Sequence, residues 1–168
     1  MPDEARVVVV NTTPLIALSL INRLSFLQAL YETVLIPPAV QEEALRGGAR
    51  GTGVAELKRA DWIRVLELRE PGRADLLSDL DRGEAEVLAL ALEVKADLAI
   101  IDEKLARRHA RRLGVPLSGT LGVLLRAKRQ GLLDQVRPSI EQIRRAGIRL
   151  SDAVVEEALG LAREQAGS

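Results

Sequence analysis

The sequence contains no cysteine, which excludes disulfides, thiolate zinc sites and cysteine nucleophiles. It has one tryptophan, one tyrosine and one phenylalanine, too few rings to form a platform on which single-stranded bases stack. The one histidine, His109, is flanked by arginines, so we interpret it as a surface residue and find no Ser-His pair. The candidates for catalysis or metal binding are therefore mainly side chains that carry oxygen atoms.

Long apolar runs are also absent, because no stretch approaches the roughly 20 residues of a membrane span. The first residues, MPDEARVVVV, lack the basic start and small-residue cleavage site of a signal peptide. Together with the lack of cysteine, this makes the reducing cytoplasm the simplest expected location.

The formal net charge is +0, so no overall field attracts nucleic acid. The basic residues are nevertheless uneven: only four of the 24 are lysines, and arginines concentrate after residue 103 in KLARRHARR and RAKRQ. The planar fork of arginine binds phosphate well, but a solvated amphipathic face explains the same pattern.

The 168 residues have the length of one globular domain and an ordinary apolar content of 47%. Apolar runs predict buried strands over 7–10, 33–38, 61–68, 96–102 and 115–120. Helices are predicted from Pro14 onward and over 39–47, 84–94, 103–114, 121–133, 137–147 and 151–164, with a flexible loop at 47–53 and a short helix or loop at 70–83. This alternation predicts one three-layer α/β domain over 1–168, with a central parallel sheet, a core of about 6–135 and a C-terminal helical extension of about 136–165.

Polar residues cluster where these strands end and the next helices begin, which is where parallel sheets bind ligands. Two carboxylates held about 4 Å apart repel each other by about 4 kcal/mol at an effective dielectric near 20, so a group of them implies a cation. Oxygen ligands suit Mg²⁺ or Mn²⁺ better than zinc. The residues at these ends are Asn11, Thr12, Thr13, Glu42, Glu43, Glu84, Glu86, Asp102, Glu103, Ser118, Gly119 and Thr120.

Each of these positions also has a purely structural interpretation, because such residues are common at helix N-termini. Capping and metal binding are compatible, since both use the junction between a strand and a helix. The capping interpretation covers Asp81 with Glu84 as a capping box, Asp102 and Thr13 as caps of the helices that follow them, and Glu42 with Glu43 as solvated first-turn acids.

Four segments, in order, resemble the PIN-domain superfamily, and more narrowly a poorly characterised prokaryotic branch of it. The similarity spans roughly residues 6 to 165 and implies a PIN-like fold and a ribonuclease that depends on Mg²⁺ or Mn²⁺. It also implies RNA as substrate, and often the role of toxin beside a small antitoxin protein. The segments are VVVNTTPLIALSLINRLSFLQAL, VLIPPAVQEEAL, LDRGEAEVLALALEVKADLAIIDEKLARRHARRLG and SGTLGVLLRAKRQGLL.

The resemblance also implies roles for particular residues. The acidic positions of the family fall on Asn11, Glu43, Glu84 and Asp102, with Glu103 as the alternative to Asp102. Glu43 is preferred to Glu42 because it keeps the V-x-x-E spacing.

Residues that contact phosphate are expected around these acids. Thr12 and Thr120 match hydroxyl positions that line the site. The arginines that would contact the RNA backbone are Arg107, Arg108, Arg111 and Arg112.

Asn11 departs from the family pattern, because an amide oxygen can coordinate a hard cation but brings no charge. The loss of one carboxylate should weaken metal binding, which leaves two readings open: a weakened enzyme, or an inactive module that binds RNA or an antitoxin. The apolar helices in 140–165 exceed what a small sheet needs, so we expect a homodimer or capture of an antitoxin helix.

Overall fold

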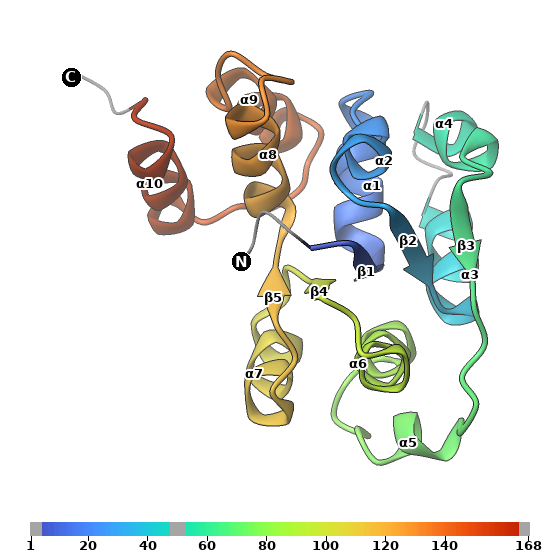
Figure 1. Ribbon diagram of the computed structural model, residues 1–168. Helices are drawn as coiled ribbons and strands as arrows, with labels where there is room; N and C mark the ends of the chain where they lie inside the picture. The colour runs from blue at the N-terminus through green and yellow to red at the C-terminus, as the bar shows by residue number, and fades with distance from the viewer. Residues whose placement is uncertain (1–4, 48–52, 165–168) are drawn as a thin grey trace.

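The computed structural model describes residues 5–47 and 53–164, and within them five strands form one parallel sheet (Figure 1). The order across the sheet is β3-β2-β1-β4-β5, so β1 lies at the centre. The strands are β1 (Val7–Val10), β2 (Thr33–Ile36), β3 (Ile63–Val65), β4 (Leu98–Ile100) and β5 (Leu117–Ser118). Helices lie on both faces of this sheet, which confirms the predicted three-layer α/β architecture.

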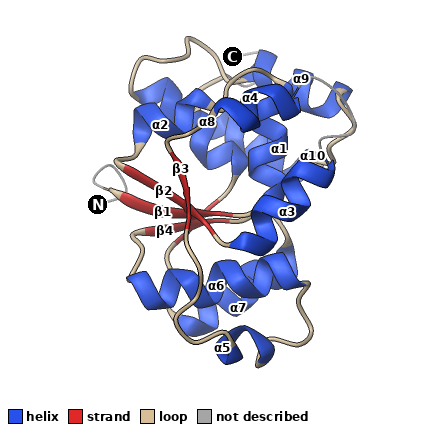
Figure 2. Cartoon of the chain, turned by 90° about the vertical axis from the view of Figure 1, so that its right-hand side faces the viewer, coloured by secondary structure: helices blue, strands red, loops and turns tan. Residues whose placement is uncertain are grey.

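The helices divide into two layers (Figure 2). Helices α1, α2 and α8 lie on one face of the sheet, and α6 and α7 lie on the other. Val8, Val9 and Val10 of β1 are therefore fully buried, which is why the strand reads as an unbroken apolar run. The bounds are α1 (Thr12–Leu20), α2 (Ser25–Leu30), α6 (Arg82–Val94), α7 (Lys104–Leu113) and α8 (Thr120–Arg129).

The remaining helices extend these layers. They are α3 (Pro38–Gly47), α4 (Gly53–Arg59), α5 (Gly72–Asp75), α9 (Arg137–Arg145) and α10 (Asp152–Leu161). Helix α3 packs against both α1 and α6, so it joins the two layers beside the carboxyl ends of the strands. Helix α10 packs on α8. Among the described residues, no helix combines the length and the apolar character needed to cross a membrane.

Local signals predicted most of these elements but missed two. Pro38 begins α3 and so ends the strand that was predicted to reach residue 38. Helix α1 begins at Thr12, two residues before the predicted start at Pro14. Helices α2 and α4 were not predicted, and residues 48–52 of the predicted loop lie outside the described residues.

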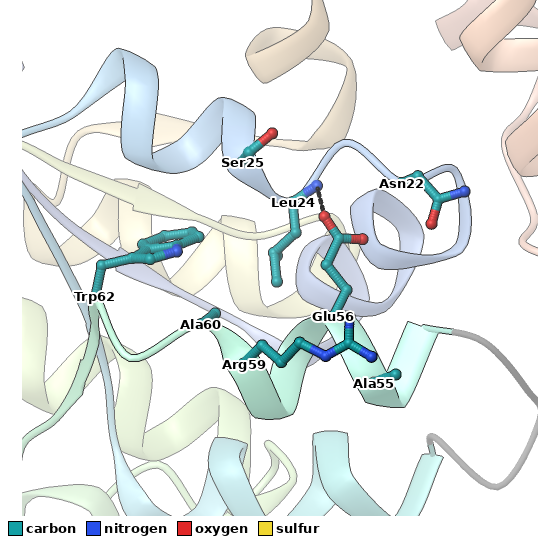
Figure 3. Close-up of a pocket in the computed structure, with 8 residues that line it drawn as sticks. All are labelled: Asn22, Leu24, Ser25, Ala55, Glu56, Arg59, Ala60 and Trp62. Atoms are coloured by element: carbon teal, nitrogen blue, oxygen red, sulfur yellow. Dashed lines mark hydrogen bonds between the residues drawn. The ribbon is translucent and has the colours of Figure 1, made fainter.

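Helix α2 lacks a local cap, which explains why no sequence signal marked it. Its N-cap residue is Leu24, whose side chain cannot accept a hydrogen bond. Instead, Glu56 of α4 reaches across, and its Oε1 accepts the Leu24 N–H at 3.1 Å (Figure 3). Burial raises the pKa of Glu56, although backbone N–H groups of Leu24 and Ser25 oppose the shift. The start of α2 therefore depends on a residue 32 positions along the chain.

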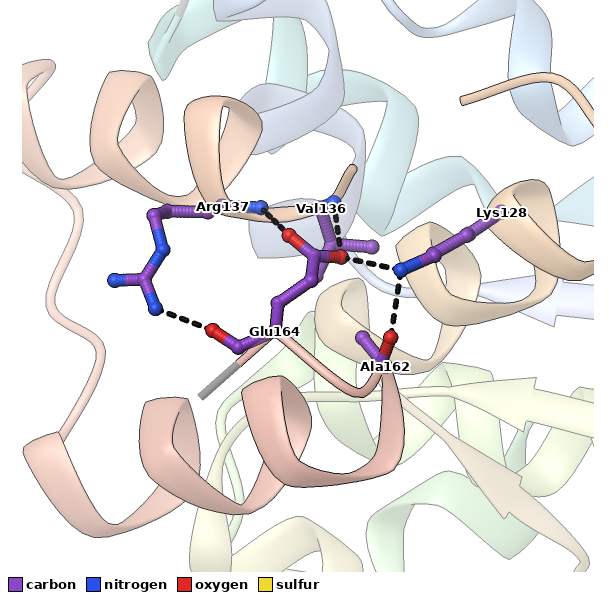
Figure 4. Close-up of polar contacts among 5 residues, drawn as sticks. All are labelled: Lys128, Val136, Arg137, Ala162 and Glu164. Carbon is purple, nitrogen blue, oxygen red and sulfur yellow. Dashed lines mark hydrogen bonds and ion pairs between the residues drawn. The ribbon is translucent and has the colours of Figure 1, made fainter. Parts of the chain in front are cut away.

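The end of the described chain is fastened in a similar way (Figure 4). The Glu164 carboxylate accepts N–H bonds from Val136 at 2.8 Å and Arg137 at 3.1 Å, where α9 begins. It also accepts a bond of 2.9 Å from Lys128 Nζ of α8, which in turn donates to Ala162 O at 2.6 Å. The Glu164 side chain is only 6% exposed. One carboxylate thus joins the end of α10 to α8 and α9.

We predict that Glu164→Ala lowers the free energy of unfolding at pH 7 by about 2–3 kcal/mol, because buried donors lose their acceptor. Burial alone would raise the pKa of Glu164, but the bonds from Lys128, Val136 and Arg137 lower it overall. The stabilisation is thus present above the unfolded-state pKa of 4.5 and is lost as pH falls below it. Denaturant unfolding measures the change, and Glu157→Ala on the exposed side of α10 is the control. Equal effects of the two substitutions would contradict the prediction.

Candidate functional site

Asn11 lies at the carboxyl end of the central strand and is the N-cap residue of α1, but its side chain does not cap that helix. Its backbone N–H donates to Ile100 O at 3.0 Å, which fixes the residue against the end of β4. The side chain is buried, and its Nδ2 donates to Glu103 Oε2 at 3.2 Å. The amide is therefore oriented by an acid from the neighbouring junction.

Glu103 is held from two sides. Besides Asn11, Thr13 donates its hydroxyl to Glu103 Oε1 at 2.6 Å. The prediction that Thr13 caps α1 is therefore wrong, because its hydroxyl turns to the next strand-to-helix junction instead. Glu103 is itself the N-cap residue of α7 but makes no side-chain cap there.

The two acids of α3 point in different directions. Thr12 donates its hydroxyl to Glu43 Oε2 at 2.9 Å, so Glu43 faces the sheet edge. Glu42 is 72% exposed and pairs with Arg46 at 3.3 Å, one turn along the same helix. The interpretation of both as first-turn acids is wrong, because α3 begins at Pro38 and its first turn holds no acid. Glu42 alone is a solvated acid, one turn further along the helix.

The first turn of α6 lies directly against Glu43. A Cβ atom built on Gly83 would lie 2.7 Å from Glu43 Oε2, so any side chain there would force that carboxylate to move. Sequence reasoning did not single out Gly83. The dipeptide Arg82–Gly83 inside an expected helix start was the available signal.

Glu84 is the most perturbed acid of this group. Asp81 Oδ1 accepts the Glu84 N–H at 2.8 Å, which confirms Asp81 as the cap of α6. The pKa of Glu84 is raised to about 8, chiefly by burial and further by the hydrogen bond with Asp81 and the negative charges of Asp81, Glu103 and Glu43. Four carboxylates from three separate elements are therefore close enough to affect one another.

Asp102 has a structural partner other than the expected one. Its Oδ1 accepts the Thr120 N–H at 2.8 Å and its Oδ2 accepts the Thr120 hydroxyl at 2.6 Å. Asp102 thus caps α8, and the prediction that it caps the helix after Glu103 is wrong. Burial raises the pKa of Asp102 and the charge of Glu103 adds to this, while the Thr120 bonds and Arg107 oppose it.

The arginines of α7 are not equivalent. Arg107 is half-buried, and its NH1 group donates to Ile101 O at 2.6 Å and Ser118 O at 3.0 Å, where β4 and β5 end. Arg108, Arg111 and Arg112 are exposed. Three of the four predicted phosphate contacts are therefore open to solvent, while Arg107 braces the backbone beside Asp102.

The structure brings most of the expected residues to one edge of the sheet. Asn11 contacts Glu103, Thr12 contacts Glu43, and Glu84 lies near enough to Glu43 and Glu103 for their charges to raise its pKa. Asp102 and Thr120 adjoin them, and Asp102 is coupled to the group through the charge of Glu103. As oriented, however, no three acidic or histidine side chains in the described ranges are arranged to hold a metal ion. Their oxygens face threonine hydroxyls instead.

We predict that Glu84→Gln removes part of the pH dependence of stability. In the folded protein Glu84 keeps its proton up to about pH 8, whereas in the unfolded chain it loses the proton near 4.5. Stability should therefore fall as pH rises between these values, since the unfolded state binds fewer protons there. Thermal unfolding in EDTA near both ends of that range should show a smaller fall for the variant than for wild type. Glu42→Gln, as a control, should behave like wild type; a fall of the same size in Glu84→Gln would disprove the prediction.

Comparison with known protein families agrees with the fold. The PIN domain family model matches residues 7–164, which is nearly the whole chain. No curated protein matches the chain. From β1 at the start of the matched region to α10 near its end, the parallel sheet and all the junctions described above fall within it. The chain belongs to the PIN-domain family.

Proposed function

We propose that this protein is a metal-dependent ribonuclease that hydrolyses RNA phosphodiesters at the edge formed by Asn11, Glu43, Glu84 and Asp102. The nuclease-type fold of PIN domains supports the reaction class. The observation that carries the proposal is the convergence of carboxylates on this edge: Glu43 lies against Thr12 and the first turn of α6, and Glu103 lies against Asn11. Consistent with this, burial and the neighbouring carboxylates raise the pKa of Glu84 to about 8. Mutual repulsion among these carboxylates lowers the stability of the fold. A bound cation would reduce that repulsion.

The donor set fits a hard divalent cation. PIN domains generally use divalent metals, and carboxylate and amide oxygens are the ligands that Mg²⁺ and Mn²⁺ prefer. We assign Glu43, Glu84 and Asp102 as the charged ligands, with Asn11 as a neutral one and Glu103 beside it. Without a cation, the carboxylates of Glu43 and Asp102 accept hydrogen bonds from threonine hydroxyls.

Bound Mg²⁺ or Mn²⁺ would supply activation of water and neutralisation of the charge on the phosphate. The chain's own groups would place the reactants. Thr12 and Thr120, whose hydroxyls already lie against Glu43 and Asp102, would orient the water or a phosphate oxygen. Arg107 would act on substrate only indirectly, because it keeps Asp102 and the strand ends in place.

The RNA backbone would lie along the exposed face of α7. Arg108, Arg111 and Arg112 follow the i, i+3, i+4 spacing of one helical face and are exposed. Arginines on such a face position a nucleic acid without specifying its sequence. The acids for the reaction thus lie at the sheet edge, and the cations for binding lie along α7, which begins at that edge and runs away from it.

A second candidate function is a catalytically weak or inactive PIN-like module that binds RNA or an antitoxin. The neutral Asn11 favours it, since the first-strand position brings no charge to a cation. The hydrogen bonds from Thr12 to Glu43 and from Thr120 to Asp102 favour it too, because they satisfy these acids without a metal.

We propose further that the protein is the toxin of a toxin–antitoxin pair and acts in the cytoplasm, where its RNA substrate would be. The C-terminal helix α10 leaves Leu161 68% exposed and Val154 44% exposed. These side chains support a homodimer or a helix of a small antitoxin as partner. A small gene directly upstream would favour the toxin role.

We predict that the wild-type protein binds Mn²⁺ saturably near neutral pH and that Glu84→Gln/Asp102→Asn abolishes binding, because two charged ligands are lost. Calorimetric titration measures this, and Mn²⁺-dependent cleavage of RNA should be lost in the same variant. The control is Glu42→Gln/Glu157→Gln, which removes two exposed acids. Wild-type protein that neither binds Mn²⁺ nor cleaves RNA would leave the inactive module as the function.

We predict that Arg108→Ala/Arg111→Ala/Arg112→Ala weakens RNA binding about tenfold or more. For single-stranded RNA the slope of log affinity against log salt should become shallower by about 2, since three phosphate contacts are lost. Binding at several salt concentrations measures both quantities. Arg64→Ala/Arg69→Ala/Arg149→Ala removes the same charge from exposed positions elsewhere. An equal loss of affinity in that control would show that only net charge matters.

A further inference from the structure

Asn11 is a neutral, buried side chain beside the carboxylate of Glu103. The residue is 3% exposed, and its Nδ2 donates to Glu103 Oε2 at 3.2 Å. With the amide nitrogen on Glu103, the amide oxygen is left on the opposite branch of the side chain. Glu103 therefore sets which atom of Asn11 is free to act as a ligand.

The carboxylate of Glu103 contacts the start of α1 and does not cap α7, the helix that follows Glu103. Both of its oxygens are bonded to residues at the start of α1, one to Asn11 and the other to Thr13 at 2.6 Å. Helix α1 has no acidic residue in its first turn and no side-chain cap. Glu103 thus places a negative charge at that helix N-terminus, where the helix dipole favours it.

The adjacent acid, Asp102, serves a different helix. Its carboxylate is bound to the N–H and hydroxyl of Thr120 at the start of α8. The carboxylates of the successive residues Asp102 and Glu103 therefore contact the starts of two different helices. The two acids therefore have different hydrogen-bond partners.

We propose that Asn11 and Glu103 form one unit in which Glu103 supplies the negative charge that the first-strand position lacks. The charge sits one junction away from its usual place and is held there by Thr13. Glu103 is thus a positioning residue for the Asn11 amide and the source of the charge at this position. The effect of the pair on metal affinity rests on the proposed metal-dependent function; the pairing itself does not.

This arrangement predicts that the charge can be exchanged between the two positions. In Asn11→Asp alone, two carboxylates would face each other at about the present 3.2 Å, with no donor between them. In Asn11→Asp/Glu103→Gln, the new glutamine can donate its NH₂ group to position 11 and still accept the Thr13 hydroxyl through its oxygen. The total charge and the number of hydrogen bonds then equal those of the wild type.

The test compares wild type, Asn11→Asp, Glu103→Gln and the double variant by thermal unfolding in EDTA near pH 8. We expect Asn11→Asp to lower Tm by about 5 °C, and the double variant to return to within about 2 °C of wild type. Titration with Mn²⁺ should show about tenfold weaker binding in Glu103→Gln and recovery to within about threefold in the double variant. Glu42→Gln is the control in both measurements.

Two results would overturn the proposal: a Tm of Asn11→Asp equal to or above that of wild type in EDTA, or a double variant in which the two losses simply add. If Asn11→Asp does not fold, a folded double variant supports the proposal and an unfolded one overturns it. If none of the four proteins binds Mn²⁺, the proposed function is wrong, while the unfolding cycle in EDTA still decides whether the pair exists.

Discussion

The fold depends on carboxylates that cap helices to which they do not belong. The N-cap residues of α2, α8 and α9 have side chains that cannot accept a hydrogen bond, and an unpaired N–H group buried there would be costly. These residues are Leu24, Gly119 and Val136. Each of these starts is satisfied by an acid from a distant element. Because every such contact joins two elements across the molecule, the starts of these helices depend on tertiary packing. The pairs are Glu56 with Leu24, Asp102 with Thr120, and Glu164 with Val136 and Arg137.

The same principle operates at the candidate site, where structural and chemical roles fall on the same atoms. Asp102 caps α8 and is also an expected metal ligand, while Glu103 holds the start of α1. Glu43 is bonded to Thr12. A cation bound here would therefore compete with hydrogen bonds that stabilise the fold. Metal affinity and folding stability are linked through these side chains.

The sequence predicted the layers of the fold because its strands are unbroken apolar runs and its helices have strong periodicity. It also placed Glu84 at a helix start and Glu43 in the helix after the second strand, both at one edge of the sheet, since strand-to-helix junctions are local features. It failed for Thr13 and Asp102, whose partners lie 90 and 18 residues away. Capping rules consider only the next three or four residues, so they assigned both side chains to the wrong helix. Helix α2 was not predicted for the same reason, because the acceptor at its start, Glu56, lies 32 residues further along the chain.

Gly83 shows how such a site constrains the evolution of the chain. Alanine is the better helix former, so the substitution would favour α6. Its Cβ, however, would meet the far end of the flexible Glu43 side chain at 2.7 Å rather than any backbone atom. The helix would tolerate the change and Glu43 would swing away from Thr12. Selection for stability and selection for the placement of this carboxylate thus oppose each other at one residue, and a lineage that gave up the site would be free to replace the glycine.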